Sequence, residues 1–182
     1  MELYVVFQYK EKYPALTGHA LTDALIRDCL GSSDLSIERT GKGKPFIQDP
    51  SFVGRSISVS HSEGTFALLV AGENVGLDIQ YARDVKTDRI AARLFTEEEM
   101  SYAQAGIEKD RFFVLWTRKE AYSKFTGSGM EQIMRKEPVL GREDVQFIDL
   151  RLEDGCYCSI CLERTGVKGG QESDEIQISY RK

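Results

Sequence analysis

Apolar residues in the first half of the chain predict a strand, a helix and then several short strands. The run LYVVF, rich in β-branched and aromatic residues, predicts a strand near the amino terminus, and HALTDALIRDCLG predicts a helix that ends at Gly31. Gly, Glu and Asn then separate three further apolar or alternating runs, which predicts an antiparallel hairpin or meander. These three runs are SISVS, TFALLVA and VGLDI.

In the second half of the chain, the pattern predicts helices followed by strands. Residues 88–94 have helical periodicity, and Thr96 followed by Glu99 is typical of a capping box that opens another helix. A helix over residues 110–125 is apolar around most of its circumference, which indicates burial. After the Gly-rich GSGM come three strand-like runs, VQFIDLRL, CYCSICLE and EIQISY. This order of elements predicts an α+β fold.

Length, charge and hydropathy narrow the classes of protein. A chain of 182 residues that is 41% hydrophobic is long enough for one globular domain or for two small lobes. Its net charge of −5 argues against a general electrostatic preference for nucleic acid. No apolar run approaches the roughly 20 residues that span a bilayer, and the amino terminus lacks a signal-peptide pattern. We therefore expect a cytoplasmic protein with no nucleic-acid and no membrane partner.

Cys156, Cys158 and Cys161 form a CxCxxC cluster, whereas Cys29 lies elsewhere in the chain. Such a cluster can indicate a zinc site. However, no second cluster of Cys and His completes a ligand set. The better interpretation is a strand in which reduced thiols serve as small buried hydrophobic residues.

Three charged residues, Lys119, Glu120 and Lys124, lie inside the apolar helix RFFVLWTRKEAYSKF. Glu120 and Lys124 are one turn apart on the same face. One interpretation is an ion pair on a solvated edge, worth a few tenths of a kcal/mol. The other is a functional group of charges whose partners lie elsewhere in the fold.

Oxygen-bearing side chains occupy one face of the strand VGLDIQ. Strand alternation places Asp78 and Gln80 together, about 7 Å apart at the backbone, opposite the three apolar residues of the run. Both could reach one hydrated Mg²⁺, directly or through water. A solvent-facing side of the strand is the alternative.

A basic turn, RTGKGKP, contains Arg39, Lys42 and Lys44 beside two glycines, and these cations could surround a phosphate. It is not a Walker P-loop, because a proline follows Lys44 and no helix starts there. A basic turn without function is the alternative.

In SVSHS, Ser60 and His61 are adjacent on a strand and point to opposite faces, and there is no GxSxG elbow. A catalytic Ser-His dyad is therefore disfavoured.

Taken together, the order and identity of these motifs resemble the 4'-phosphopantetheinyl transferase family, over about residues 39–130. RTGKGKP resembles the coenzyme A loop of the family, and SVSHS resembles its (N/S)xSHS segment. VGLDIQ resembles its metal motif and LFTEEEM its FTxxE segment. The most specific similarity is that of WTRKEAYSK to the WxxKEAxxK signature.

The resemblance implies a Mg²⁺-dependent transfer of phosphopantetheine from coenzyme A to a serine of an acyl, polyketide or peptidyl carrier protein, with release of 3',5'-ADP. Asp78 and Glu120 would bind Mg²⁺, with Gln80 or a water as a further ligand. Lys119 would neutralise the pyrophosphate, Glu120 would accept the proton of the serine, and Lys124 would assist the leaving group. The phosphates of coenzyme A would be held by Arg39, Lys42, Lys44, Ser60 and His61.

The resemblance also implies the architecture. We expect a monomer of two similar lobes, residues 1–85 and 86–182, related by pseudo-twofold symmetry, with the cofactor between them. Gln80 stands where many relatives carry Glu, so we expect weaker metal affinity. The segment before the first long helix is shorter than in larger relatives, so we expect fewer contacts to the 3'-phosphate.

Other classes of function remain open at this point. A coenzyme A or nucleotide-binding module without transferase activity is compatible with Gln80, although the Lys119, Glu120 and Lys124 set opposes it. A metal-dependent phosphohydrolase needs only Asp78 and Glu120, and it would cleave coenzyme A without an acceptor. An interaction scaffold would show no metal dependence.

Overall fold

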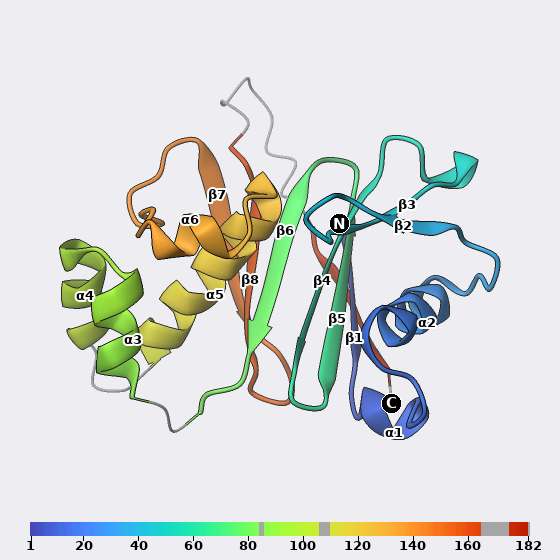
Figure 1. The fold of residues 1–182 in the computed structure, drawn as a ribbon, viewed down its shortest axis with the longest axis horizontal. Coiled ribbons are helices and arrows are strands. Elements are labelled where there is room, and N and C mark those ends of the chain that lie inside the picture. Colours follow the sequence, from blue (N-terminus) through green and yellow to red (C-terminus); the bar gives the residue numbers. More distant parts are fainter. Residues whose placement is uncertain (84–85, 106–109, 165–174, 182) are drawn as a thin grey trace. The chain divides into compact units, whose positions relative to one another are not determined.

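A computed structural model describes residues 1–83, 86–105, 110–164 and 175–181 (Figure 1). The chain divides into two units. The first is Met1–Asn74 together with the strand near the carboxyl terminus, and the second is Val75–Thr165. Each unit combines helices with a mainly antiparallel sheet, which confirms the α+β class. The lobe limits 1–85 and 86–182 and the pseudo-twofold symmetry stay predictions.

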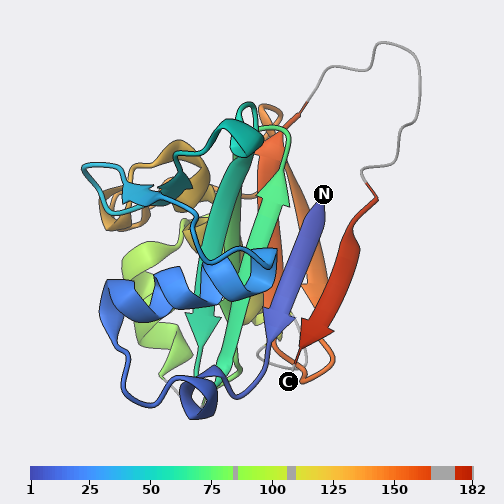
Figure 2. The ribbon, with the colours of Figure 1, turned by 90° about the vertical axis from the view of Figure 1, so that its right-hand side faces the viewer.

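The first unit is built on a four-stranded sheet. In order across the sheet, its strands are β4 (Ser56–Ser62), β5 (Thr65–Ala71), β1 (Glu2–Val6) and β9 (Gln177–Arg181). β4 and β5 form the predicted antiparallel hairpin, and Figure 2 shows β9 running parallel beside β1. Helix α2 (Gly18–Leu30) lies across one face of this sheet and, as predicted, ends at Gly31, whose φ of 66° terminates the helix.

Several short elements of the first unit have no clear signal in the sequence. They are α1 (Tyr9–Lys12), the 3₁₀ turn η1 (Pro50–Phe52) and the two-stranded hairpin of β2 (Ile37–Arg39) and β3 (Pro45–Ile47). The basic turn RTGKGKP joins β2 to β3. It is closed by two backbone hydrogen bonds, from Thr40 N to Lys44 O at 3.0 Å and from Gly43 N to Thr40 O at 2.8 Å.

The second unit is built on a three-stranded antiparallel sheet. In order across the sheet, its strands are β6 (Val75–Gln80), β8 (Tyr157–Glu163) and β7 (Val145–Arg151). Its helices are α3 (Thr87–Leu94), α4 (Glu97–Gln104), α5 (Asp110–Thr126) and α6 (Met130–Met134). α5 packs along β6 and β8 (Figure 1), and the predicted capping box of Thr96 and Glu99 opens α4. Within the described ranges, no helix is long and apolar enough to cross a membrane.

The meander prediction is wrong for the run VGLDI. This run is β6, and it pairs with β8, whose residues come about eighty positions later in the chain, rather than with β5. The apolar pattern identifies β6 as a strand but carries no information on its partner. The first two of the three runs do pair, so the hairpin alternative is the correct one.

The cysteines occupy core positions. Cys156, Cys158 and Cys161 are buried in or next to β8, and Cys29 is buried in α2, which confirms the interpretation of the thiols as small core residues. Burial raises the pKa of Cys29, Cys156 and Cys161 to about 12. These thiols therefore stay protonated and unreactive at neutral pH.

Gly76 is the point of closest approach between β6 and α5. A Cβ atom at Gly76 would lie 1.9 Å from the carbonyl oxygen of Ala121 and 2.6 Å from the backbone nitrogen of Phe125. Both are backbone atoms, so no change of side-chain rotamer can relieve the clash. Only glycine lets the helix backbone rest on the strand at this position.

We expect Gly76→Ala to lower the free energy of unfolding by about 2 kcal/mol or more, because the added methyl group forces α5 away from β6. Gly72→Ala is the matched control, since a Cβ at Gly72 meets no atom within 4 Å. Its effect should stay within about 0.5 kcal/mol. Urea denaturation of the two variants makes the comparison, and equal stabilities would contradict the close approach.

Candidate functional site

Strand β6 directs Asp78 and Gln80 towards α5. Gly76 meets the backbone of α5, and strand alternation puts Asp78 and Gln80 on the same face of the strand as Gly76. Asp78 is only 6% exposed, so the alternative of a solvent-facing side chain does not hold for it. The three apolar residues of β6, Val75, Leu77 and Ile79, lie on the opposite face and are fully buried.

Lys124 of α5 reaches β6. Its Nζ donates to Asp78 Oδ1 at 2.8 Å and to the carbonyl oxygen of Leu77 at 2.9 Å. The sequence suggested an ion pair between Glu120 and Lys124 within the helix. In the structure, Lys124 forms an ion pair with Asp78, which links the helix to the strand. This contact brings the second lysine of WTRKEAYSK next to the aspartate of VGLDIQ.

Glu120 lies one turn before Lys124 on α5 and is partly buried. Burial, together with the negative charge of Asp78, raises the pKa of Glu120 to about 7, whereas the charge of Lys124 opposes this shift. Two carboxylates thus share a poorly hydrated site with one lysine. A divalent cation would relieve this excess of negative charge.

The donor set suits Mg²⁺, a hard cation that prefers oxygen ligands. Within the described residues, no three His, Cys, Asp or Glu side chains gather as a ready-made metal cage. Protein-bound Mg²⁺ commonly needs only one or two carboxylates, since waters and substrate phosphates complete its shell. Asp78 and Glu120 could therefore hold it together with a phosphate ligand. The amide nitrogen of Gln80 donates to the carbonyl of Tyr81 at 2.9 Å, and the amide oxygen is the atom of this side chain that can bind a metal.

A small pocket adjoins these residues in the second unit. It has a volume of about 160 Å³, and its lining is mostly apolar. The lining residues are Gln80, Arg83, Ile90, Phe112, Phe113 and Trp116. Trp116 precedes Glu120 by one helical turn, so the pocket lies beside the candidate metal ligands.

Lys119 is turned away from these carboxylates and into the core. Its side chain is 1% exposed, and its Nζ lies 2.8 Å from Glu99 Oε2 and donates to the carbonyl of Glu137 at 2.6 Å. Burial lowers the pKa of Lys119, and Glu99 partly offsets this by favouring the charged form. This burial does not favour the pyrophosphate contact that the resemblance implies for Lys119.

Sequence reasoning placed Glu99 in the capping box and in the segment that resembles FTxxE, but it predicted no partner for Glu99 outside its own helix. Glu99 is fully buried, and its Oε2 accepts from the backbone nitrogen of Thr96 at 2.9 Å as well as from Lys119. Its Oε1 accepts from the backbone nitrogen of Val139 at 2.8 Å. Glu99 therefore joins the start of α4, the middle of α5 and the segment after α6.

The basic residues of the first unit lie on or beside the β2–β3 hairpin. Arg39 forms an ion pair with Asp23 of α2 at 2.5 Å, so part of its charge is neutralised within the unit. Lys44 donates to Asn74 Oδ1 at 3.2 Å, and Lys42 is exposed in the turn. All three cations thus belong to this turn or to its flanking strand, and their contact with a phosphate stays a prediction.

Ser60 and His61 lie in β4, the outer strand of the four-stranded sheet. Ser60 is buried and His61 is exposed, which confirms that they point to opposite faces. The ring of His61 lies 6.2 Å from that of Tyr9. A single ligand could reach both residues only by lying along the edge of the strand.

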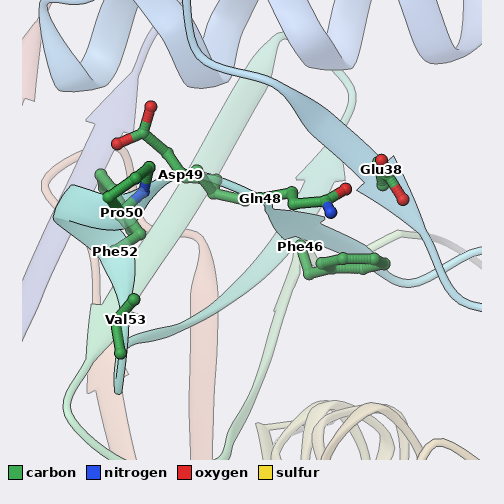
Figure 3. Close-up of a pocket in the computed structure, with 8 residues that line it drawn as sticks. Glu38, Phe46, Gln48, Asp49, Pro50, Phe52 and Val53 are labelled. Carbon is green, nitrogen blue, oxygen red and sulfur yellow. The ribbon is translucent and has the colours of Figure 1, made fainter.

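A wider pocket of about 540 Å³ lies on the outer face of the β2–β3 hairpin (Figure 3). Glu38 and Phe46 are directly opposite each other on the two strands, and Asp49 follows them in the chain. Two carboxylates and no Lys or Arg line this pocket. Its charge therefore does not suit the phosphates of a nucleotide.

We expect Glu99→Gln to lower the free energy of unfolding by about 3–5 kcal/mol, because it leaves the charge of Lys119 buried without its partner. The double variant with Lys119→Met removes both charges and should recover much of the loss. Urea denaturation of the single and double variants gives the coupling energy. Strictly additive losses would mean that the two side chains do not interact.

The sequence of the chain is similar to those of proteins from one superfamily. The sequence model of the 4'-phosphopantetheinyl transferase superfamily matches residues 74–170, just over half of the chain. The chain is 26% identical to the 4'-phosphopantetheinyl transferase gsp of Aneurinibacillus migulanus, covering 84% of this chain and 69% of the relative. It is 32% identical to psf-1 of Bacillus pumilus, covering 76% and 60%, and 28% identical to Sfp of Bacillus subtilis, covering 75% and 65%. The chain thus spans about two thirds of the length of these relatives, and it belongs to the 4'-phosphopantetheinyl transferase superfamily.

Proposed function

We propose that the protein transfers the 4'-phosphopantetheine group of coenzyme A to a serine of an acyl, polyketide or peptidyl carrier protein and releases 3',5'-ADP. The observation that carries this proposal is the meeting of β6 and α5 at Asp78, Glu120 and Lys124. The first two residues supply carboxylates for a metal ion, and the third supplies a cation for a phosphate. Phosphoryl transfer needs these elements, because its catalysis depends on positioning and on charge stabilisation.

Asp78 and Glu120 would hold Mg²⁺, with the amide oxygen of Gln80 or a water as a further ligand. When bound, Mg²⁺ would supply positive charge that stabilises the negative charge developing on the diphosphate. Gln80 contributes no formal charge, so we expect this site to hold Mg²⁺ less tightly than one with three carboxylates. Phosphate oxygens of coenzyme A would complete the shell.

Glu120 is the proposed general base. Its carboxylate would accept the proton of the carrier serine, directly or through a water, as the serine oxygen bonds to the β-phosphorus of coenzyme A. The bond from that phosphorus to the bridging oxygen then breaks, and its electron pair leaves with 3',5'-ADP. Lys124 would stabilise the leaving group, and this role is supported by its ammonium, which lies 2.8 Å from Asp78 and thus beside the proposed metal.

The remaining proposed site residues divide into two groups. In the first unit, Arg39, Lys42, Lys44, Ser60 and His61 are the proposed contacts for the phosphates at the nucleotide end of coenzyme A. In the second unit, we propose that Lys119 acts through Glu99, by holding the part of α5 that carries Glu120, rather than by contacting the pyrophosphate. Burial of its side chain supports this reassignment.

The test is incubation of the protein with coenzyme A, Mg²⁺ and an apo carrier protein, followed by intact mass spectrometry of the carrier. We expect the carrier to gain one phosphopantetheine group, and EDTA to abolish this gain. Glu120→Ala should lower kcat at least about 100-fold, because it removes both the base and a metal ligand. Acyl, polyketide and peptidyl carriers should each be tried.

Glu131→Ala is the matched control, since Glu131 is an exposed glutamate of α6 that forms a surface ion pair with Arg135. It should transfer at the rate of the unmodified protein. Cleavage of coenzyme A without modification of any carrier would instead support a phosphohydrolase. Binding of coenzyme A without reaction would support a non-catalytic binding module.

A further inference from the structure

A row of polar side chains crosses the sheet of the second unit beneath α5. Asp78 of β6 is directly opposite Ser159 of β8, and Ser159 is directly opposite Asp149 of β7. Directly opposed residues in neighbouring strands point to the same face of a sheet. Asp78 faces α5, so all three lie on the face that the helix covers.

Helix α5 provides one partner for each member of the row. Thr117 Oγ1 lies 2.7 Å from Ser159 Oγ, and Arg118 Nε donates to Asp149 Oδ2 at 3.0 Å. At the other end of the row, Lys124 donates to Asp78, as described above. The helix is thus fastened to β8, β7 and β6 by three separate polar contacts.

The middle of the row is a chain of hydrogen bonds. Ser159 donates to Asp149 Oδ1 at 2.8 Å, and its oxygen lies 2.7 Å from Thr117 Oγ1. The Thr117 hydroxyl also lies 3.0 Å from the carbonyl oxygens of Phe113 and Val114, so these carbonyls compete with Ser159 for its single proton. Thr117 and Ser159 are both fully buried, so these bonds are shielded from bulk water. The guanidinium of Arg118 also binds Asp149 through Nη2 and lies 5.4 Å from the ring of Phe147, which restricts its motion.

These contacts bracket Glu120. Thr117 and Arg118 lie three and two residues before it, and Lys124 lies one turn after it, a span of about 10 Å along the helix axis from Thr117 to Lys124. In the proposed reaction, Asp78 would bind the metal and Lys124 would contact the diphosphate. The contact between these two residues would then be lost, whereas the contacts to Ser159 and Asp149 would remain.

We propose that Ser159 and Asp149 are positioning residues, which hold α5 over β6 through Thr117 and Arg118 so that Glu120 stays beside Asp78 when substrate displaces Lys124. This inference rests on the proposed function for the role of Glu120. It concerns residues that touch neither the metal nor coenzyme A. A misplacement of about 1 Å can cost about 100-fold in rate, so a modest shift of α5 is sufficient to matter.

The test compares Ser159→Ala and Asp149→Asn with the unmodified protein in two measurements. The first is the affinity for Mn²⁺ alone, followed by electron paramagnetic resonance, and the second is the transfer rate with its KM for coenzyme A. We expect the affinity for Mn²⁺ to fall about threefold and kcat to fall about tenfold, with KM for coenzyme A unchanged. The expected loss in kcat is smaller than about 100-fold because α5 should shift by less than about 1 Å. Asp144→Asn is the matched control, because it breaks another carboxylate–arginine pair, with Arg142, outside the row.

The two measurements separate this inference from the proposed function. If the unmodified protein binds Mn²⁺ but modifies no carrier, the proposed function fails, and the Mn²⁺ affinities alone still decide the role of the row. Variants that melt at a lower temperature yet keep the Mn²⁺ affinity of the Asp144→Asn control would overturn the positioning role. Arg118→Gln removes the same contact from the side of the helix, and it replaces Asp149→Asn if that variant does not fold.

Discussion

The contact between Gly76 and the backbone of α5 determines the geometry of the second unit. Because Gly76 has no side chain, the helix rests directly on β6 at Ala121. This close approach also brings the neighbouring residues of the strand and of the helix close to one another. Asp78 follows Gly76 by two positions on the same face of the strand, and Glu120 immediately precedes Ala121 on the helix. A larger residue at position 76 would separate the carboxylates that the proposed reaction needs.

The second unit contains two different arrangements of buried charged residues. Glu99 and Lys119 form a closed pair, since each also has backbone partners and both side chains are excluded from solvent. Asp78, Glu120 and Lys124 instead form a set with one negative charge in excess, and the pKa of Glu120 rises to about 7 as a result of its burial and of Asp78. The first arrangement stabilises the fold, whereas the second is suited to bind a cation.

Periodicity predicted most of the longer elements, and strand alternation placed Asp78 and Gln80 on one face. The family signature in α5 then drew attention to Glu120 and Lys124. Pairing between distant segments could not be predicted, so the partner of β6 was missed and so were Ser159 and Asp149, which are ordinary polar residues in their own runs. The environment of Lys119 was missed for the same reason, because Glu99 lies twenty positions away and in another helix.

The central claim is that β6 and α5 form one metal site for phosphoryl transfer. The most direct measurement is anomalous X-ray diffraction from crystals of the protein grown with coenzyme A and Mn²⁺. We expect a single strong anomalous peak within about 2.3 Å of a carboxylate oxygen of Asp78 and of one from Glu120, with the diphosphate as a further ligand. A peak bound elsewhere, or coenzyme A bound with no metal at these two residues, would contradict the account.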